Sequence, residues 1–155
     1  MTVCVVTVSD RASKGEYEDK SGPAIEQLIL ETYPDCRIVR ELIPDEIKVI
    51  GAALERNTSS DFILTTGGTG LSERDITPEA TELFCDKRLP GIEESLRAAS
   101  LKETSSAMLS RGYAGVRGAT IVINFPGSVR AVTLCTKVVV PIMGHAIKML
   151  RGEGH

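Results

Sequence analysis

Short apolar runs alternate along the chain with segments of helical periodicity. The predicted strands are Val3–Val8, Arg37–Ile43, Phe62–Thr66 and Thr120–Asn124. Their interiors are nearly continuous in Val, Ile and Leu, which is typical of strands that are covered on both faces. The alternation of strands and helices therefore predicts an α/β domain with a largely parallel sheet.

The segments between and after these runs carry apolar stripes with the period of an α-helix. The stripes are Ile25, Leu28, Ile29 and Thr32; Ile47, Ile50, Gly51 and Leu54; and, in a final helix over Ser128–Leu150, Val132, Cys135, Val139, Met143, Ala146 and Leu150. Two further helices are expected, one opened by Thr77-Pro78-Glu79 and one over Ile92–Leu101.

Several residues mark where these helices begin or are interrupted. Asp45 and Thr77 are the predicted N-caps of the second and third helices, because a short polar side chain can accept a hydrogen bond from the first turn. Pro23 and Pro78 suit the first turn of a helix. Pro141 lies inside the final helix, where it predicts a kink or a break.

Residues 104–118 follow neither pattern and are rich in Ser, Gly and Arg, which favours an active-site loop or a short edge strand. There is no internal repeat and no linker. The chain has 155 residues, of which 42% are hydrophobic and 25% charged, as in ordinary globular proteins. We therefore expect a single domain over residues 1–155.

Charge and cysteine content narrow the function classes. A net charge of −3 gives no electrostatic reason to expect a nucleic acid as partner. No apolar run approaches the ~20 residues of a membrane span, and the segment Met1–Val6 is interpreted as a core strand and not as a signal peptide. The four cysteines form no Cys-x-x-Cys motif, so buried free thiols and a reducing, cytoplasmic location are expected.

Polar segments follow three predicted strands at their carboxyl ends, where open parallel sheets bind ligands. They are Ser9-Asp10-Arg11, Gly67–Asp75 and Asn124–Ser128. The first is either an Asx-type turn or the edge of a ligand site. In the last, Pro126-Gly127-Ser128 is either a turn with an N-cap or a set of backbone donors for an anion.

Gly67-Gly68-Thr69-Gly70 has three glycines in four residues. Glycine permits a tight turn and close approach to a ligand, and successive backbone amides can form an anion-binding nest. The segment matches neither the P-loop signature nor the dinucleotide-binding fingerprint. On its own it is equally compatible with a purely conformational turn.

Charged residues next to this turn suit a nucleotide. Arg74 suits phosphate oxygens, and Asp75 suits the Mg²⁺ that accompanies ATP. Asp45 is a second carboxylate at a strand end. The alternatives are structural, namely a surface turn for Arg74 and Asp75 and a simple N-cap for Asp45. Ser110 and Arg111 either contact a phosphate or belong to a solvated loop.

Other chemistries are disfavoured by what the chain lacks. It has only two histidines, and His145 in the final helix is expected to be a packed or surface residue. There is no Gly-x-Ser-x-Gly nucleophile elbow. Zinc chemistry and triad hydrolysis are therefore disfavoured. Phosphoryl or nucleotidyl transfer remains, in which positioning and a metal ion supply most of the catalysis.

Taken together, these segments resemble a family of molybdenum-cofactor biosynthesis proteins that includes the Mog-type proteins and the G domains of plant Cnx and of gephyrin. The matching segments occur in family order and cover nearly the whole chain: Thr7–Arg11, Ser21–Pro23, Ile43–Glu46, Leu64–Ala80, Pro90–Ile92, Met108–Arg111, Gly115–Gly118 and Ile123–Ser128. The most specific is Thr-Thr-Gly-Gly-Thr-Gly followed by Arg-Asp-Ile-Thr-Pro-Glu-Ala.

The resemblance implies a three-layer αβα fold with a mostly parallel, Rossmann-like open sheet, commonly assembled as a homotrimer. It also implies Mg²⁺- and ATP-dependent adenylylation of molybdopterin, which gives adenylyl-molybdopterin and pyrophosphate. Asp45 and Asp75 match the family's catalytic aspartates, and we expect them to position Mg²⁺ and the phosphates.

The resemblance further implies a pocket around these two aspartates. The expected substrate- and nucleotide-binding residues are Ser9, Asp10, Gly67, Gly68, Thr69, Gly70, Arg74, Glu79, Ser110, Pro126, Gly127 and Ser128. Molybdate insertion would belong to a separate protein that receives the product.

Two alternatives remain at this point. A MoaB-like protein would bind molybdopterin, or serve as a scaffold, without catalysis. The pattern Arg74–Thr77 favours the Mog side of the family. A generic nucleotide-binding protein such as a dehydrogenase is disfavoured because its glycine fingerprint is missing. The choice between molybdenum and tungsten stays open.

Overall fold

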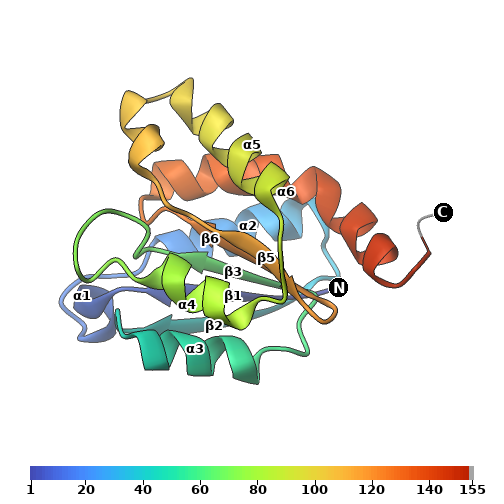
Figure 1. Ribbon diagram of the computed structural model, residues 1–155, viewed down its shortest axis with the longest axis horizontal. Helices are drawn as coiled ribbons and strands as arrows, with labels where there is room; N and C mark the ends of the chain where they lie inside the picture. Colours follow the sequence, from blue (N-terminus) through green and yellow to red (C-terminus); the bar gives the residue numbers. More distant parts are fainter. Residues whose placement is uncertain (154–155) are drawn as a thin grey trace.

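The computed structural model describes residues 1–153 and is built on a six-stranded sheet (Figure 1). The strands are β1 (Thr2–Val8), β2 (Arg37–Ile43), β3 (Phe62–Thr66), β4 (Lys87–Arg88), β5 (Ala114–Arg117) and β6 (Thr120–Phe125). They lie in the order β2-β1-β3-β6-β5-β4. The first four strands of this order pair in parallel, whereas β5 runs antiparallel to both β6 and β4. The largely parallel sheet is as predicted.

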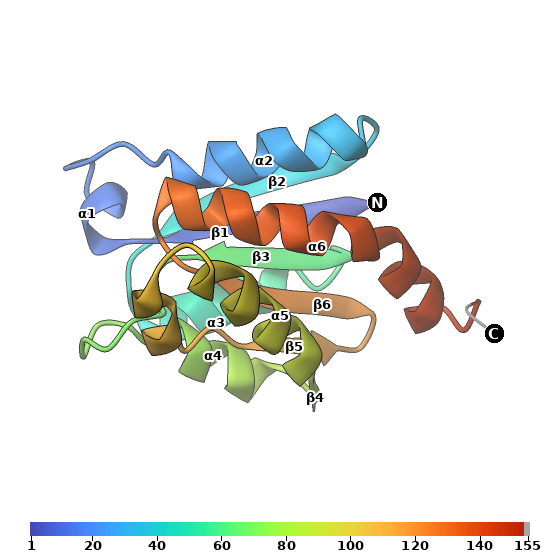
Figure 2. The same cartoon turned by 90° about the horizontal axis from the view of Figure 1, so that it is seen from above.

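Helices cover both faces of the sheet (Figures 1 and 2). They are α1 (Asp10–Ser13), α2 (Ser21–Thr32), α3 (Ile47–Arg56), α4 (Thr77–Phe84), α5 (Pro90–Leu101), the 3-10 helix η1 (Ser105–Leu109) and α6 (Val129–Leu150). Residues of α2, α5 and α6 pack into one hydrophobic cluster, and residues of α3 and α4 pack into another on the opposite face. The three-layer αβα architecture is therefore confirmed.

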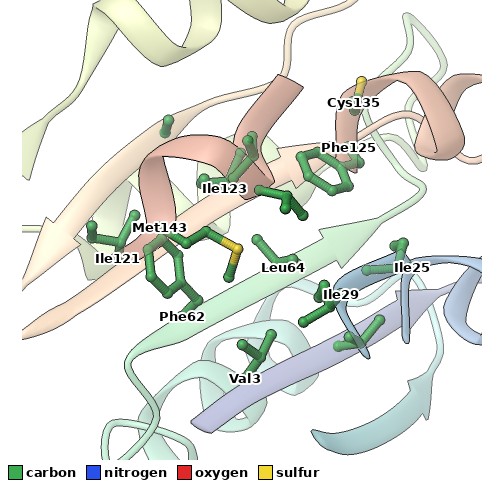
Figure 3. Packing of buried hydrophobic residues seen from close by; sticks show 14 of the residues in the cluster. Val3, Ile25, Ile29, Phe62, Leu64, Ile121, Ile123, Phe125, Cys135 and Met143 are labelled. Atoms are coloured by element: carbon green, nitrogen blue, oxygen red, sulfur yellow. The ribbon is translucent and has the colours of Figure 1, made fainter. Parts of the chain in front are cut away.

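The central strands are buried on both faces, because successive residues of a strand point to opposite sides. On β1, Val3 and Val5 pack into the cluster beneath α2 and α6, where Figure 3 shows Val3 near Ile29. Cys4 and Val6 pack toward α3 instead. Full burial of an aliphatic side chain contributes about 1.5–3 kcal/mol of transfer free energy. This packing fixes the carboxyl ends of the central strands in place.

Two expectations about the sheet are wrong. β2 was expected to be covered on both faces, but it is an edge strand in which only Ile43 is buried. Exposed charged residues such as Arg37 and Arg40 interrupt its apolar run. Of the alternatives for residues 104–118, the edge strand is wrong: the segment holds η1 and β5, and β5 lies between β6 and β4. The edge strand on that side, β4, has two residues and no sequence signal of its own.

Two predicted N-caps are also wrong. α3 is preceded by Glu46 at the N-cap position and not by Asp45. α4 has Ile76 at that position, so Thr77 is its first helical residue. Neither helix has a side-chain cap bond. By contrast, Ser128 caps α6 by accepting a hydrogen bond from Ala131 N at 3.2 Å.

Helix α6 continues through Pro141, so of the two alternatives predicted there, a kink or a break, the break is absent. Val139 and Met143, on either side of the proline, are buried against the sheet, and this packing outweighs the lost hydrogen bond. By length and composition alone α6 could also cross a membrane. Its buried stripe packs on the sheet, as in the core helix of a globular domain.

The cysteines are free thiols. Cys4, Cys36 and Cys135 are buried as predicted, whereas Cys85 is only half-buried. Burial, helped by the nearby Glu41 carboxylate, raises the pKa of Cys4 to about 12, so this thiol is unreactive at neutral pH.

A buried carboxylate ties α5 to the antiparallel side of the sheet. Glu93 is 3% exposed and accepts hydrogen bonds from Arg88 Nη2 at 2.8 Å, Arg97 Nη2 at 3.3 Å and Ala114 N at 3.0 Å. Desolvation acts to raise the pKa of Glu93. The hydrogen bonds and the positive charges outweigh it and hold the pKa below its ordinary value.

We expect Glu93→Gln to lower the free energy of unfolding at pH 7 by about 2 kcal/mol, because hydrogen bonds to charged groups are worth about 1.5–3 kcal/mol. The folded-state pKa of Glu93 lies below its unfolded value. Its stabilising contribution is therefore present above the unfolded pKa and is lost as the pH falls through the folded pKa. In urea unfolding, variant and wild type should converge in acid.

The control is Glu94→Gln, which changes the exposed neighbouring carboxylate and should follow the wild type at every pH. Equal stability of Glu93→Gln and wild type at pH 7 would contradict the anchoring role of Glu93.

Candidate active site

The segments that follow β1, β2, β3 and β6 meet at one edge of the sheet (Figure 1). Gly67 N donates a hydrogen bond to Phe125 O at 3.1 Å, which joins the ends of β3 and β6. Ser9 N donates to Ile43 O at 2.8 Å, which joins the ends of β1 and β2. The polar segments singled out in the sequence therefore lie together, as expected of a parallel sheet.

The turn after β3 needs two of its glycines for backbone reasons. Gly67 and Gly68 have φ angles of 101° and 66°, a region that favours glycine. A Cβ atom at Gly67 would stand 2.3 Å from Val8 O, and one at Gly68 would stand 2.3 Å from Thr77 Oγ1. The tight turn is confirmed, and the missing side chains let it lie against Val8 O and Thr77 Oγ1.

Thr77 closes this turn from the side of α4. Its hydroxyl donates to Gly67 O at 2.9 Å, and its backbone N donates to Gly68 O at 3.1 Å. The side chain that was expected to cap α4 therefore holds the glycine turn, which explains why it does not serve as the cap.

Asp10 and Asp45 form a reciprocal pair between the segments after β1 and β2. Asp10 N donates to Asp45 Oδ2 at 2.7 Å, and Asp45 N donates to Asp10 Oδ1 at 3.0 Å. Arg74 donates to both carboxylate oxygens of Asp10 at 2.9 Å. Asp45 Oδ2 therefore accepts its hydrogen bond from Asp10 and not from the first turn of α3, while Oδ1 faces Gly68.

The two carboxylates of this pair have opposite pKa shifts. Burial raises the pKa of Asp45, and repulsion from the carboxylates of Asp10 and Asp75 raises it further. The hydrogen bond from the Asp10 amide and the charge of Arg74 lower it, but by less. Desolvation also acts on Asp10, but the hydrogen bonds from Arg74 and from the Asp45 amide outweigh it and hold that pKa below its ordinary value. The charge of Asp45 is therefore poorly compensated, and a nearby cation would stabilise it.

Asp75 belongs to a local turn and faces the same region. Its Oδ2 accepts a hydrogen bond from Ser72 N at 2.9 Å, and its own N donates to Ser72 O at 3.0 Å. The carboxylate stands over Gly70, where a Cβ atom would lie 2.9 Å from Oδ2. The surface turn left open by the sequence is present, and it directs the Asp75 carboxylate toward the glycine turn.

A cavity of about 230 Å³, which we call the polar cavity, lies between Asp45, Asp75 and the glycine turn. It is lined by Thr7, Val8, Ser9, Tyr17, Ser21, Asp45, Thr66, Gly67, Gly68, Asp75 and Gly127. Six of these were predicted site residues. Tyr17 was missed because it lies in a polar loop without any pattern. Ser21 lies in a family segment, Ser21–Pro23, that could have indicated it.

A second cavity of about 290 Å³, the apolar cavity, adjoins the same turn. Its lining includes five predicted residues, namely Thr69, Gly70, Ser110, Pro126 and Ser128. The remaining lining residues are Glu93, Leu96, Arg97, Ser100, Thr104, Ser106, Ala107, Leu109, Gly112, Tyr113, Asn124, Ala131 and Cys135. Most come from α5, η1 and α6. The segments of α5 and α6 were predicted only as helices, whereas residues 104–118, which include η1, were predicted as an active-site loop or a short edge strand. Consecutive residues of the glycine turn therefore line two different cavities.

Three predicted site residues line neither cavity: Asp10, Arg74 and Glu79. Asp10 and Arg74 are paired with each other, as described. Glu79 is paired with Arg111, whose hydrogen bond lowers the pKa of the carboxyl. His145 is exposed on α6, in agreement with a surface role.

The carboxylates fit a cation that arrives with a ligand. Within residues 1–153, no group of three or more His, Cys, Asp or Glu side chains is placed to hold a metal by itself. Asp45 and Asp75 supply two carboxylates to one cavity. Mg²⁺ is commonly held by one or two carboxylates together with substrate phosphates, so the donor set suits Mg²⁺ bound to a nucleotide.

A family model described as a probable molybdopterin binding domain matches residues 4–145. The chain belongs to this molybdopterin-binding family. It is 41% identical over 153 residues to the molybdopterin adenylyltransferase of Helicobacter pylori (strain ATCC 700392 / 26695), covering 96% of this chain and 87% of that protein. The family resemblance read from the sequence is therefore confirmed.

Solved structures of the family share the fold. The molybdopterin biosynthesis enzyme MoaB from Thermus thermophilus has a TM-score of 0.89 and 38% identity, over 97% of this chain and 96% of that chain. A structure described as the anomalous substructure of MogA has a TM-score of 0.91 and 35% identity, over 97% and 99% of the two chains. Because both types superpose well, the fold does not separate them.

We expect Gly68→Ala to lower the free energy of unfolding by at least about 2 kcal/mol, because a strained backbone position costs about 1–3 kcal/mol and the new Cβ would meet Thr77. Gly51→Ala is the matched control. A Cβ atom there has no neighbour within 4 Å, and it should stabilise α3 by about 0.5–1 kcal/mol. Urea unfolding measures both, and a Gly68→Ala protein as stable as wild type would contradict this account of the turn.

Proposed function

We propose that the chain is a molybdopterin adenylyltransferase that transfers AMP from Mg-ATP to the terminal phosphate of molybdopterin. An oxygen of the pterin phosphate forms a bond to the α-phosphorus of ATP, and the bond from that phosphorus to the β-phosphate oxygen breaks. The products are adenylyl-molybdopterin and pyrophosphate. The relative named molybdopterin adenylyltransferase at 41% identity supports the activity.

The observation that carries the proposal is the polar cavity. Its lining combines two carboxylates, Asp45 and Asp75, with the backbone of Gly67 and Gly68, and it includes no Lys or Arg among the described residues. Phosphates would be repelled by these carboxylates unless a divalent cation lies between them. When bound, Mg²⁺ would neutralise charge on the phosphates.

The residues around the cavity bind and orient the substrates. The backbone amides of Gly68, Thr69 and Gly70 form the anion-binding turn, whereas the Gly67 amide is bonded to Phe125 O. Gly127 and Ser128 present the N-terminus of α6, whose backbone donors favour an anion. Asp45 and Asp75 hold the cation. The apolar cavity, with Leu96 and Tyr113 in its lining, receives the ring system of one substrate next to the phosphates.

The proposal extends to the assembly and the location of the protein. Residues 1–155 form a single adenylyltransferase domain that works in the cytoplasm as a homotrimer. Its product passes to a separate protein for metal insertion. The alternative, a MoaB-like protein that binds molybdopterin without catalysis, is the other outcome of the assay below.

We expect purified protein incubated with ATP, Mg²⁺ and molybdopterin to yield adenylyl-molybdopterin by mass spectrometry and pyrophosphate in equal amount. Removal of Mg²⁺ with a chelator should abolish both products, because the cation offsets repulsion between the carboxylates and the phosphates. Tight binding of molybdopterin with neither product would reject the enzyme and favour the binding protein.

We expect Asp75→Asn to lower kcat about 100-fold, a typical loss for one electrostatic group of an active site, while the fold and most of the molybdopterin affinity remain. Steady-state kinetics and urea unfolding measure the two effects. Asp35→Asn, at an exposed position before β2, is the control and should leave both unchanged. Full turnover of Asp75→Asn would remove Asp75 from the catalytic machinery.

A further inference from the structure

One arginine holds the segment that carries Asp75 at several points. Arg111 N donates to Thr69 O at 3.0 Å. In the side chain, Nε donates to Gly70 O at 2.8 Å and Nη2 donates to the backbone oxygen of Asp75 at 2.6 Å. Nη1 donates to Glu79 Oε1. Both ends of the segment 69–75 and the first turn of α4 are thus joined to one residue.

The segment has little else to fix it. Figure 1 shows that the loop between β3 and α4 extends beyond the sheet, and residues 71–74 are exposed. Leu71, its only large apolar residue, is 67% exposed, so burial contributes little to its position. The ion pair of Arg74 with Asp10 lies at the surface, where such pairs are weak. The placement of Asp75 therefore depends mainly on hydrogen bonds.

The guanidinium of Arg111 suits this task because it presents N–H donors in a rigid, planar fork. Its three partners are two backbone oxygens and one carboxylate, which converge on it from the turn, the loop and α4. Arg111 lines neither the polar nor the apolar cavity, although both of its neighbours, Ser110 and Gly112, line the latter. The hypothesis that Arg111 contacts a phosphate is therefore not supported, because these donors are engaged within the protein.

We infer that Arg111 is a positioning residue that fixes the backbone of Asp75 and thereby sets the distance between the Asp75 and Asp45 carboxylates across the polar cavity. This inference rests on the proposed function, in which the two carboxylates share a cation with the substrate phosphates. In that arrangement a displacement of about 1 Å costs roughly 100-fold in rate.

The first test is kinetic. Arg111→Met should lower kcat by roughly 10- to 100-fold, while KM for ATP at saturating Mg²⁺ changes by less than about threefold, because the substrate loses no direct contact. Arg111→Lys, which keeps the charge without the fork, should recover part of the rate. A raised KM with unchanged kcat would instead mean direct substrate binding by Arg111 and would overturn the inference.

Arg117→Met is the matched control. Arg117 donates to Phe84 O at 2.8 Å at the other end of α4 and pairs with Glu55 and Asp86. Its side chain is 40% exposed, against 36% for Arg111. Removing it should cost similar stability and leave kcat unchanged. Equal loss of kcat in both variants would reduce the role of Arg111 to general stability.

A second measurement does not depend on activity. Hydrogen–deuterium exchange of the Ser72 and Asp75 amides should speed up at least about 10-fold in Arg111→Met and stay unchanged in Arg117→Met. If wild type makes no adenylate, the proposed function fails, and the exchange result still decides whether Arg111 holds Asp75. Unchanged exchange in Arg111→Met would overturn the inference.

Discussion

The chain leaves β3 through Gly67 so close to the end of β1 that a Cβ atom there would stand 2.3 Å from Val8 O. The same glycine lies beside Gly127, where an added Cβ would be 3.4 Å from its Cα. The ends of β1, β3 and β6 can converge only because no side chain intervenes. Every other feature of the site, from the reach of Asp45 toward Gly68 to the polar cavity itself, depends on this backbone contact.

Convergence also concentrates negative charge. Asp10 is compensated by Arg74 and by a backbone amide, whereas Asp45 is partly buried and faces Asp75 across the polar cavity. Holding two carboxylates in a partly desolvated space without a cation is unfavourable. In the proposed function a magnesium–polyphosphate would offset that cost, because the carboxylates and the phosphates would then share one cation.

The features of the fold and the site that the sequence predicts well are those with a local sequence pattern. The strand runs, the helical stripes and the glycine turn are local patterns, and the structure has them near the predicted bounds. The antiparallel pairing of β5 with β4 depends on contacts between distant segments, and two-residue strands carry no periodicity. Partner choice is also non-local: nothing in the sequence near Arg74 or Arg111 indicates that one pairs with Asp10 and the other with the carbonyl of Asp75. The N-cap predictions at Asp45 and Thr77 were wrong for the same reason, because tertiary partners competed for those side chains.

The most direct measurement is a crystal structure of the protein with Mn²⁺ and α,β-methylene ATP, in which the anomalous signal of manganese locates the cation. The account predicts one Mn²⁺ between the carboxylates of Asp45 and Asp75, with the phosphates against the backbone amides of Gly68–Gly70. Phosphates bound away from this turn, or a cation held without either aspartate, would contradict it.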